Sequence, residues 1–246
     1  MPNDPPSRAK PTPILQIGSF KLTGWRALVA QLVIGGAIGA LIARRITQSA
    51  GPGGGSAYIA ANWPFFLSIA LWIAFSVYWS IAAARVSAAK SSESKASRQF
   101  HVLLVNGSLL LLFISVPGLR ARFLPNAPFL VPLGLAIQAA SLVLAMSARR
   151  HLGRNWSGEV TVKVDHELVR SGPYRRIRHP IYTAIIGMYV GPAIMISEMH
   201  SLLAVAIIMA AYWRKIGLEE RVLRGEFGAT YDDYARHSWA VIPPVW

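Results

Sequence analysis

The 246-residue sequence contains no cysteine, and this absence removes several kinds of chemistry at once. A chain without cysteine forms no disulfide, offers no thiolate nucleophile and has no sulfur ligand for zinc or an iron–sulfur cluster. The six histidines are scattered along the chain, and none has metal-ligand spacing. We therefore expect no bound metal.

Charged residues are also scarce. They make up only 15% of the chain, whereas 53% of the residues are hydrophobic and lie in blocks. A soluble domain usually carries about 25% charged residues, so the composition indicates an integral membrane protein.

Acidic residues are the rarest charged group, with 11 against 25 lysines and arginines, a formal charge of +14. The bases flank the apolar blocks, which favours the anionic headgroups of a lipid bilayer as their partner. Binding to nucleic acid is not expected, because no stretch outside the blocks interleaves bases with aromatic residues.

Six apolar blocks predict an all-α, polytopic membrane protein with about six apolar helices. The last two blocks are short, are separated by three residues and predict a C-terminal helical hairpin. Asn106 and Gln138 are expected to form hydrogen bonds between helices, and the blocks hold no relay of ionisable groups, which disfavours a transporter. The blocks are 25–43, 63–84, 102–119, 127–148, 180–197 and 201–213.

The lysines and arginines predict the orientation of the chain in the membrane. If the N-terminus is cytoplasmic, 21 of the 25 bases fall in cytoplasmic segments and four fall outside. By the positive-inside rule, the protein is a multi-pass membrane protein with both termini in the cytoplasm.

Two segments near the C-terminus are too patterned for ordinary loops. In the segment 151–180, the stretch GEVTVKV alternates like a short strand, and in the segment 213–237 apolar residues recur as on an amphipathic interfacial helix. The predicted hairpin returns the chain to the face where it began, so His179 and Tyr182 are expected near Lys215, Glu219 and Glu220. These groups could hold a ligand that has both hydroxyls and a carboxylate.

The run HELVRSGPYRRIRHPIY, followed after two apolar segments by EERVLRGEFGATYDDY, resembles the isoprenylcysteine carboxyl methyltransferase family and its phospholipid methyltransferase relatives. The shared pattern is His-x-Leu-Val, Gly-x-Tyr, Arg-His-Pro-x-Tyr, a hydrophobic hairpin, Glu-Glu and Phe-Gly-x-x-Tyr-x-x-Tyr. Each motif is weak alone, but the ordered set is specific, and it covers about residues 151–237.

The resemblance implies a membrane-embedded methyltransferase that uses S-adenosylmethionine and acts on a lipophilic or small acceptor, a carboxylate, thiol or amine, at the cytoplasmic face. The composition, the apolar blocks and the motifs together divide the chain into a disordered cytoplasmic tail (1–24), a four-helix transmembrane region (25–150) and a cofactor-binding region with the hairpin and an interfacial helix (151–246). The cofactor contacts that it implies are His166, Leu168, Val169, Tyr174, His179, Pro180, Ile181, Tyr182 and Glu219.

The remaining polar residues of this region have simpler expected roles. Glu220 is expected to pair with an arginine, and Tyr231 and Tyr234 to anchor the chain at the membrane interface.

The acceptor end of the site is expected at Lys215 or Arg214. The family has a substrate-binding arginine four residues before the glutamate pair, where this chain has Lys215 with Arg214 beside it. A planar guanidinium holds a carboxylate better than an ammonium does, so the change favours an acceptor other than a prenylcysteine carboxylate, with Lys215 facing the site.

Two other functions remain open from the sequence. Intramembrane reductases that use NADPH are similar in the C-terminal motif, and a non-enzymatic membrane subunit could keep the same fold.

The topology can be tested with reporters. A fluorescent protein fused after Trp246 should be bright in a bacterial host, and alkaline phosphatase fused at the same point should be inactive, because the charge distribution places the C-terminus inside. An active phosphatase fusion would show that the architecture is inverted.

Overall fold

The structure is a computed structural model that describes residues 59–60, 62–83, 94–153, 156 and 168–243. The apolar block 25–43, the alternating GEVTVKV stretch and His166 lie outside the described residues. The described chain is all helical, as predicted. Its elements are α3 (Trp63–Ala83), α4 (Lys95–Phe113), α5 (Leu130–Leu152), the 3₁₀ turn η2 (Gly172–Arg175), α6 (Pro180–Ile196), α7 (Met199–Phe227) and α8 (Ala229–Arg236).

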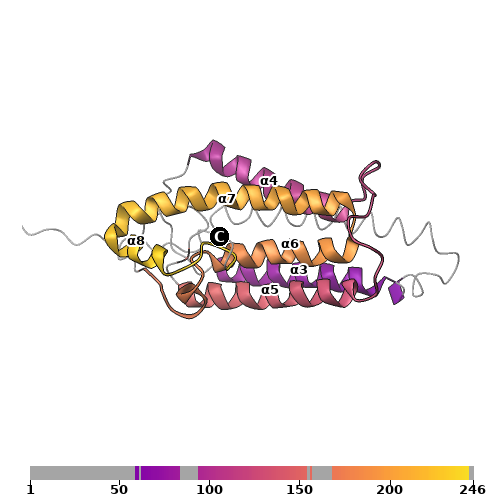
Figure 1. Cartoon of the computed structure of the whole chain (residues 1–246), viewed down its shortest axis with the longest axis horizontal. Helices are drawn as coiled ribbons and strands as arrows, with labels where there is room; N and C mark the ends of the chain where they lie inside the picture. The colour runs from indigo at the N-terminus through magenta and orange to yellow at the C-terminus, as the bar shows by residue number, and fades with distance from the viewer. Residues whose placement is uncertain (1–58, 61, 84–93, 154–155, 157–167, 244–246) are drawn as a thin grey trace, which may run out of the picture.

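The long helices lie side by side along the long axis of the molecule (Figure 1). Helix α6 packs most extensively on α5, and α4 packs on α7. Four helices, α3, α4, α5 and α7, are long and apolar enough to cross a bilayer, and α6 is a shorter apolar helix. The chain is a multi-pass integral membrane protein.

Two helices differ from the predicted blocks. Helix α4 begins seven residues before the predicted block, at Lys95, because the side chain of Ser94 caps it by accepting a hydrogen bond from the Ser97 amide at 3.2 Å. Helix α7 does not end at Trp213 but runs on to Phe227, so the expected interfacial helix over 213–237 is not a separate element. Its 29 residues span about 43 Å, which is longer than the ~30 Å hydrocarbon core, so one end projects beyond the membrane.

The predicted hairpin of α6 and α7 is present. Ser197 ends α6 in the left-handed conformation, with φ of 57°, and Glu198 is the N-cap of α7. The Ser201 side chain then donates a hydrogen bond to the Glu198 carbonyl at 2.6 Å, which closes the first turn of α7. This tight turn makes the two helices antiparallel, so the start of α6 and the far end of α7 lie at the same end of the molecule (Figure 1).

Close contact between α5 and α6 depends on three glycines. A Cβ atom at Gly191 would lie 2.4 Å from the backbone oxygen of Gly134, and one at Gly187 would lie 2.2 Å from the Ser141 hydroxyl. Gly187 and Gly191 are four residues apart on α6, which is the small-xxx-small spacing that lets membrane helices approach.

The two polar residues that were expected to join helices behave differently. The Gln138 side chain donates a hydrogen bond from α5 to the Ser68 carbonyl of α3 at 2.9 Å, as predicted. The prediction for Asn106 is wrong, because its amide donates to the Val102 carbonyl of its own helix at 2.8 Å.

We expect Gly191→Ala to destabilise the protein by about 1–3 kcal/mol, because the new methyl group meets the rigid backbone of Gly134. The matched control is Gly107→Ala on α4, where a Cβ atom meets nothing within 4 Å and the substitution should be neutral or stabilise by up to about 1 kcal/mol. Unfolding in detergent micelles measures both. Equal stability of the two variants would contradict the tight α5–α6 contact.

Candidate active site

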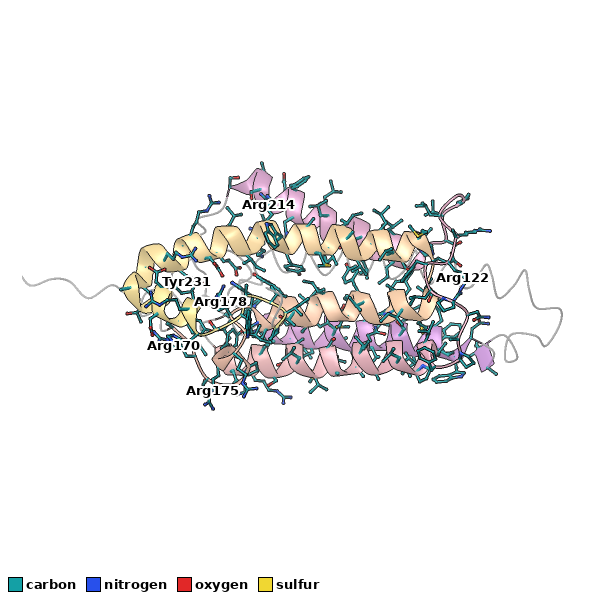
Figure 2. All side chains as sticks on the ribbon, in the orientation of Figure 1. Arg122, Arg170, Arg175, Arg178, Arg214 and Tyr231 are labelled. Atoms are coloured by element: carbon teal, nitrogen blue, oxygen red, sulfur yellow. The ribbon has the colours of Figure 1, made fainter. Side chains whose placement is uncertain are left out.

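The polar cluster predicted from the motifs forms between the start of α6 and the C-terminal half of α7. These two segments lie at the same end of the bundle (Figure 1). Three elements meet there: the segment that leads into α6, the C-terminal half of α7, and the chain around α8. Figure 2 shows Arg170, Arg175, Arg178 and Tyr231 at this end, whereas Arg122 lies at the opposite end.

Glu219 on α7 is joined to two residues at the start of α6. The Tyr182 hydroxyl donates a hydrogen bond to Oε1 of Glu219, and Nδ1 of His179 lies 3.5 Å from Oε2. The His179 ring also stacks on the Tyr182 ring, with centroids 5.6 Å apart and planes 6° apart. The three side chains therefore form one unit, although Tyr182 and Glu219 are 37 residues apart in the sequence.

Glu220 is directed to different partners. Its Oε1 accepts a hydrogen bond from Nε of Arg178 at 3.0 Å, and Oε2 accepts one from Arg224 at 3.2 Å. The predicted pairing of Glu220 with an arginine is thus present. Because Glu220 already has two guanidinium partners, it is less suited to bind a ligand than Glu219.

The two carboxylates determine the charge state of His179. Burial alone would lower the pKa of the imidazole, but Glu219 and Glu220 on either side of the ring outweigh burial and raise the pKa above 6.5. Nε2 of His179 is 3.5 Å from Oε1 of Glu220 and has no hydrogen bond within the described chain. The imidazole therefore lies between the two carboxylates, which favour its protonated form.

Arg178 attaches the C-terminal segment to the site. Its guanidinium donates hydrogen bonds to the carbonyls of Ala235, at 3.0 Å, and Ser238. The backbone continues this contact, because the amides of Arg178 and His179 donate to the carbonyls of Trp239 and Ala240 at 2.8 and 3.0 Å. The sequence showed no signal for this segment, because it depends on backbone hydrogen bonds between distant residues.

Lys215 and Arg214 point in different directions. Nζ of Lys215 lies 5.9 Å from the centre of the Tyr182 ring, next to Glu219. Arg214 donates a hydrogen bond to the Ser97 hydroxyl on α4, and its guanidinium lies 5.6 Å from the Phe100 ring. The structure brings Lys215 into the cluster and leaves Arg214 at the α4–α7 contact.

The other expected cofactor contacts are placed around this cluster. Tyr174 is buried in η2, and burial together with the nearby Glu219 raises the pKa of its phenol. Pro180 and Ile181 are buried in the first turn of α6. Leu168 and Val169 are half buried, and Val169 packs against the hydrophobic core.

The expectation that Tyr231 and Tyr234 are interfacial anchors is wrong. Their exposed fractions are 1% and 7%, and the Tyr234 hydroxyl donates to the Tyr174 carbonyl at 2.5 Å. Helix α8 turns back on the site after Gly228, so the two rings pack inside the protein. Burial raises the pKa of Tyr234 to about 12.

Tyr212 and His101 also belong to the cluster, although the sequence analysis missed both. The Tyr212 ring stacks on Tyr182 with centroids 4.6 Å apart, and His101 on α4 contacts Tyr212 edge-on at 5.3 Å. Tyr212, Lys215 and Glu219 are three and four residues apart on α7, so helical spacing could have identified Tyr212. No such signal existed for His101, because the pairing of α4 with α7 is not visible in the sequence.

Comparisons with known proteins agree with the resemblance. Residues 129–230 match the model of the phospholipid methyltransferase family. Protein-S-isoprenylcysteine O-methyltransferase B of Arabidopsis thaliana is 26% identical over 132 residues, which are 52% of this chain and 64% of the relative. A probable protein-S-isoprenylcysteine O-methyltransferase of Oryza sativa subsp. indica is 28% identical over 118 residues, 47% of this chain and 62% of the relative.

The chain spans less than two thirds of the length of these curated relatives. The structure of a eukaryotic intramembrane Ras methyltransferase, an isoprenylcysteine carboxyl methyltransferase, covers 90% of this chain and 97% of its own, at 17% identity. Its TM-score of 0.42 is too low to support an argument about fold or function. The 102 residues 129–230 are thus similar to the phospholipid methyltransferase family, and about half of the chain is similar to protein-S-isoprenylcysteine O-methyltransferases.

Proposed function

We propose that the protein is an S-adenosylmethionine-dependent methyltransferase that acts on a lipophilic or small acceptor at the cytoplasmic face of a membrane. The observation that carries the proposal is the unit of His179, Tyr182 and Glu219, with Lys215 beside it, at one end of an apolar helical bundle. His179, Tyr182 and Glu219 come from the motifs that carry the resemblance, and they meet although they lie at the start of α6 and on α7.

The chemistry of the donor set fits S-adenosylmethionine. Glu219 is a carboxylate that can accept hydrogen bonds from ribose hydroxyls, and the electron-rich rings of Tyr182 and Tyr212 beside it favour a nearby sulfonium cation. Tyr174, Pro180 and Ile181 supply a buried apolar surface next to them. When bound, the cofactor would supply an activated methyl group on its sulfonium.

The residues of the chain would then bind and orient the cofactor and the acceptor, and they would keep water out of the site. Glu219 would hold the hydroxyl side of the cofactor while Tyr182 keeps the carboxylate oriented through its hydrogen bond. Lys215 would lie on the acceptor side, because its ammonium lies beside the Tyr182 ring. The apolar walls of α6 and α7 would keep water away, which favours in-line transfer over hydrolysis.

The charge distribution supports a cytoplasmic position for this site. The segment 149–179 carries eight of the 21 bases assigned to the inside, and it leads directly into the start of α6. We infer that the cofactor enters from the cytoplasm and a lipophilic acceptor from the bilayer.

Ligand titrations separate this proposal from an NADPH-dependent reductase and a non-enzymatic subunit. The purified protein in detergent should bind S-adenosylmethionine and should not bind NADPH. Binding of NADPH alone would favour the reductase, and binding of neither would favour the non-enzymatic subunit.

Glu219→Ala should weaken the binding of S-adenosylmethionine at least tenfold, because a lost charge-assisted hydrogen bond in a partly dry site costs about 1.5–3 kcal/mol. Glu220→Ala is the matched control. It should change the affinity less, since Glu220 is paired with Arg178 and Arg224. Calorimetry measures both affinities, and equal affinity of Glu219→Ala and the parent would remove Glu219 from the site.

Lys215→Ala should impair methyl transfer, whereas Arg214→Ala should change mainly stability, because only Lys215 lies next to Tyr182. We also expect the parent to be poor at methylating the carboxylate of a farnesylated cysteine analogue, and Lys215→Arg to improve it. Radiolabelled methyl transfer measures the rates. Efficient transfer by the parent, lost in Lys215→Ala and kept in Arg214→Ala, would contradict the non-carboxylate acceptor.

A further inference from the structure

The chain just after α8, residues 238–241, belongs to none of the motifs, yet it is bonded directly to the start of the candidate site. It lies beyond the residues 129–230 that match the phospholipid methyltransferase family and beyond the motif region 151–237. The segment 238–241 is nevertheless part of the protein interior. Ala240 and Val241 have exposed fractions of 3% and 0% and belong to the hydrophobic core.

Main-chain hydrogen bonds attach the segment 238–241 to the residues that lead into α6. The Trp239 amide donates to the Arg176 carbonyl at 2.8 Å, and the Trp239 carbonyl accepts from the Arg178 amide at 2.8 Å. The Ala240 carbonyl then accepts from the His179 amide at 3.0 Å. These bonds include a parallel β-bridge, so the two stretches of chain run side by side in one register.

The His179 amide is the point at which this segment can act on the site. His179 is the N-cap of α6, and its side chain makes no capping hydrogen bond. Its carbonyl accepts the first bonds of the helix, from the amides of Tyr182 and Thr183 at 3.0 and 3.1 Å. The bond from the His179 amide to Ala240 therefore fixes the direction in which the His179 ring and, about one turn later, the Tyr182 ring leave the backbone.

Arg178 links the same segment to α7 (Figure 2). Its guanidinium donates to the Ser238 carbonyl and, at 3.0 Å, to Oε1 of Glu220. The side chains of Arg178 and Glu220 are each 12% exposed, so removal of one partner leaves the other largely buried and without its counter-charge. The Thr183 hydroxyl adds a further bond, to the Val241 carbonyl at 2.8 Å.

We propose that Arg178 is a positioning residue for the cofactor site and that it acts through the segment 238–241. The inference rests on the proposed methyltransferase function. Arg178 holds the segment against α7, and the segment holds the His179 amide. His179 and Tyr182 then meet Glu219 in the register in which the carboxylate can bind the cofactor.

A purely structural role is the alternative, because a segment with two buried residues also stabilises the fold. The two roles differ in what a variant loses. Lost stability lowers the number of chains that bind S-adenosylmethionine, whereas lost positioning weakens the affinity of the chains that still bind. Calorimetry reports the first as the stoichiometry and the second as the dissociation constant.

The test uses the full chain in detergent. Arg178→Gln should raise the dissociation constant of S-adenosylmethionine at least about fivefold, the lower end of the usual coupling between two parts of one protein. Arg224→Gln is the matched control, since Arg224 also binds Glu220, but its side chain is 47% exposed and its other ion pair is with Asp232 of α8. It should bind within twofold of the parent, because exposed ion pairs contribute little.

Two shortened chains test the segment itself. A chain that ends at Pro243 keeps residues 238–241 and should bind S-adenosylmethionine like the parent. A chain that ends at His237 should lose at least as much affinity as Arg178→Gln. If the shorter chain does not fold, Arg178→Gln still decides, because that variant keeps the whole segment.

Hydrogen exchange in the parent protein tests the coupling in the opposite direction. If the segment sets the affinity for the cofactor, the bound cofactor must stabilise the segment by the same factor. The Trp239 amide should therefore exchange at least about fivefold more slowly with saturating S-adenosylmethionine. The amides of Phe123 and Met199, which are hydrogen-bonded at the opposite end of the bundle, should keep their rates.

Three results would overturn the positioning role and leave the methyltransferase proposal intact. They are equal dissociation constants for Arg178→Gln and Arg224→Gln, a lower stoichiometry of Arg178→Gln with an unchanged dissociation constant, and exchange of the Trp239 amide that does not respond to the cofactor. A parent protein that does not bind S-adenosylmethionine would overturn both proposals.

Discussion

The hydrogen bond from Tyr182 to Glu219 is the interaction on which the functional end of the molecule depends. It forms only if α6 and α7 return to the same membrane face in the correct register, which the turn at Ser197 and Glu198 provides. The stacks of Tyr182 on His179 and on Tyr212 extend this contact to both helices. One pair of side chains thus joins the hairpin and organises the aromatic surface around Glu219.

Glu219 and Glu220 are neighbours in the sequence but have separate tasks in the structure. Successive residues on a helix differ by about 100°, so the two carboxylates cannot point the same way. Glu219 faces Tyr182, whereas Glu220 binds Arg178 and Arg224, and Arg178 in turn holds the carbonyls of the C-terminal segment. His179 lies between the two carboxylates, and its raised pKa lets it balance both. This division leaves Glu219, and not Glu220, as the carboxylate that we propose for ligand binding.

Much of the fold was predictable because each membrane helix is a continuous run of apolar residues, which is visible in the local sequence. Blocks of apolar residues identified α3, α5, α6 and the start of α7, and the motifs identified Tyr182 and Glu219. The end of α7 was missed, since the helix continues through charged residues once it leaves the membrane. The buried positions of Tyr231 and Tyr234 were missed as well, because they depend on the turn at Gly228 that folds α8 back onto Tyr174. His101 could not be found at all, because the local sequence does not indicate which face of α4 packs on α7.

The rotation of about 100° between successive helical residues also separates Arg214 from Lys215, so the two side chains have different contacts. Arg214 is used to hold α4 against α7 through Ser97 and Phe100, so it cannot also serve the acceptor. The same pairing of α4 with α7 also places the His101 ring next to the Tyr212 ring. Lys215 then remains as the cation near Tyr182, and a compact ammonium has no preference for the planar, bidentate geometry of a carboxylate. The packing of α4 on α7 thus occupies Arg214 and leaves Lys215 beside the Tyr182 ring.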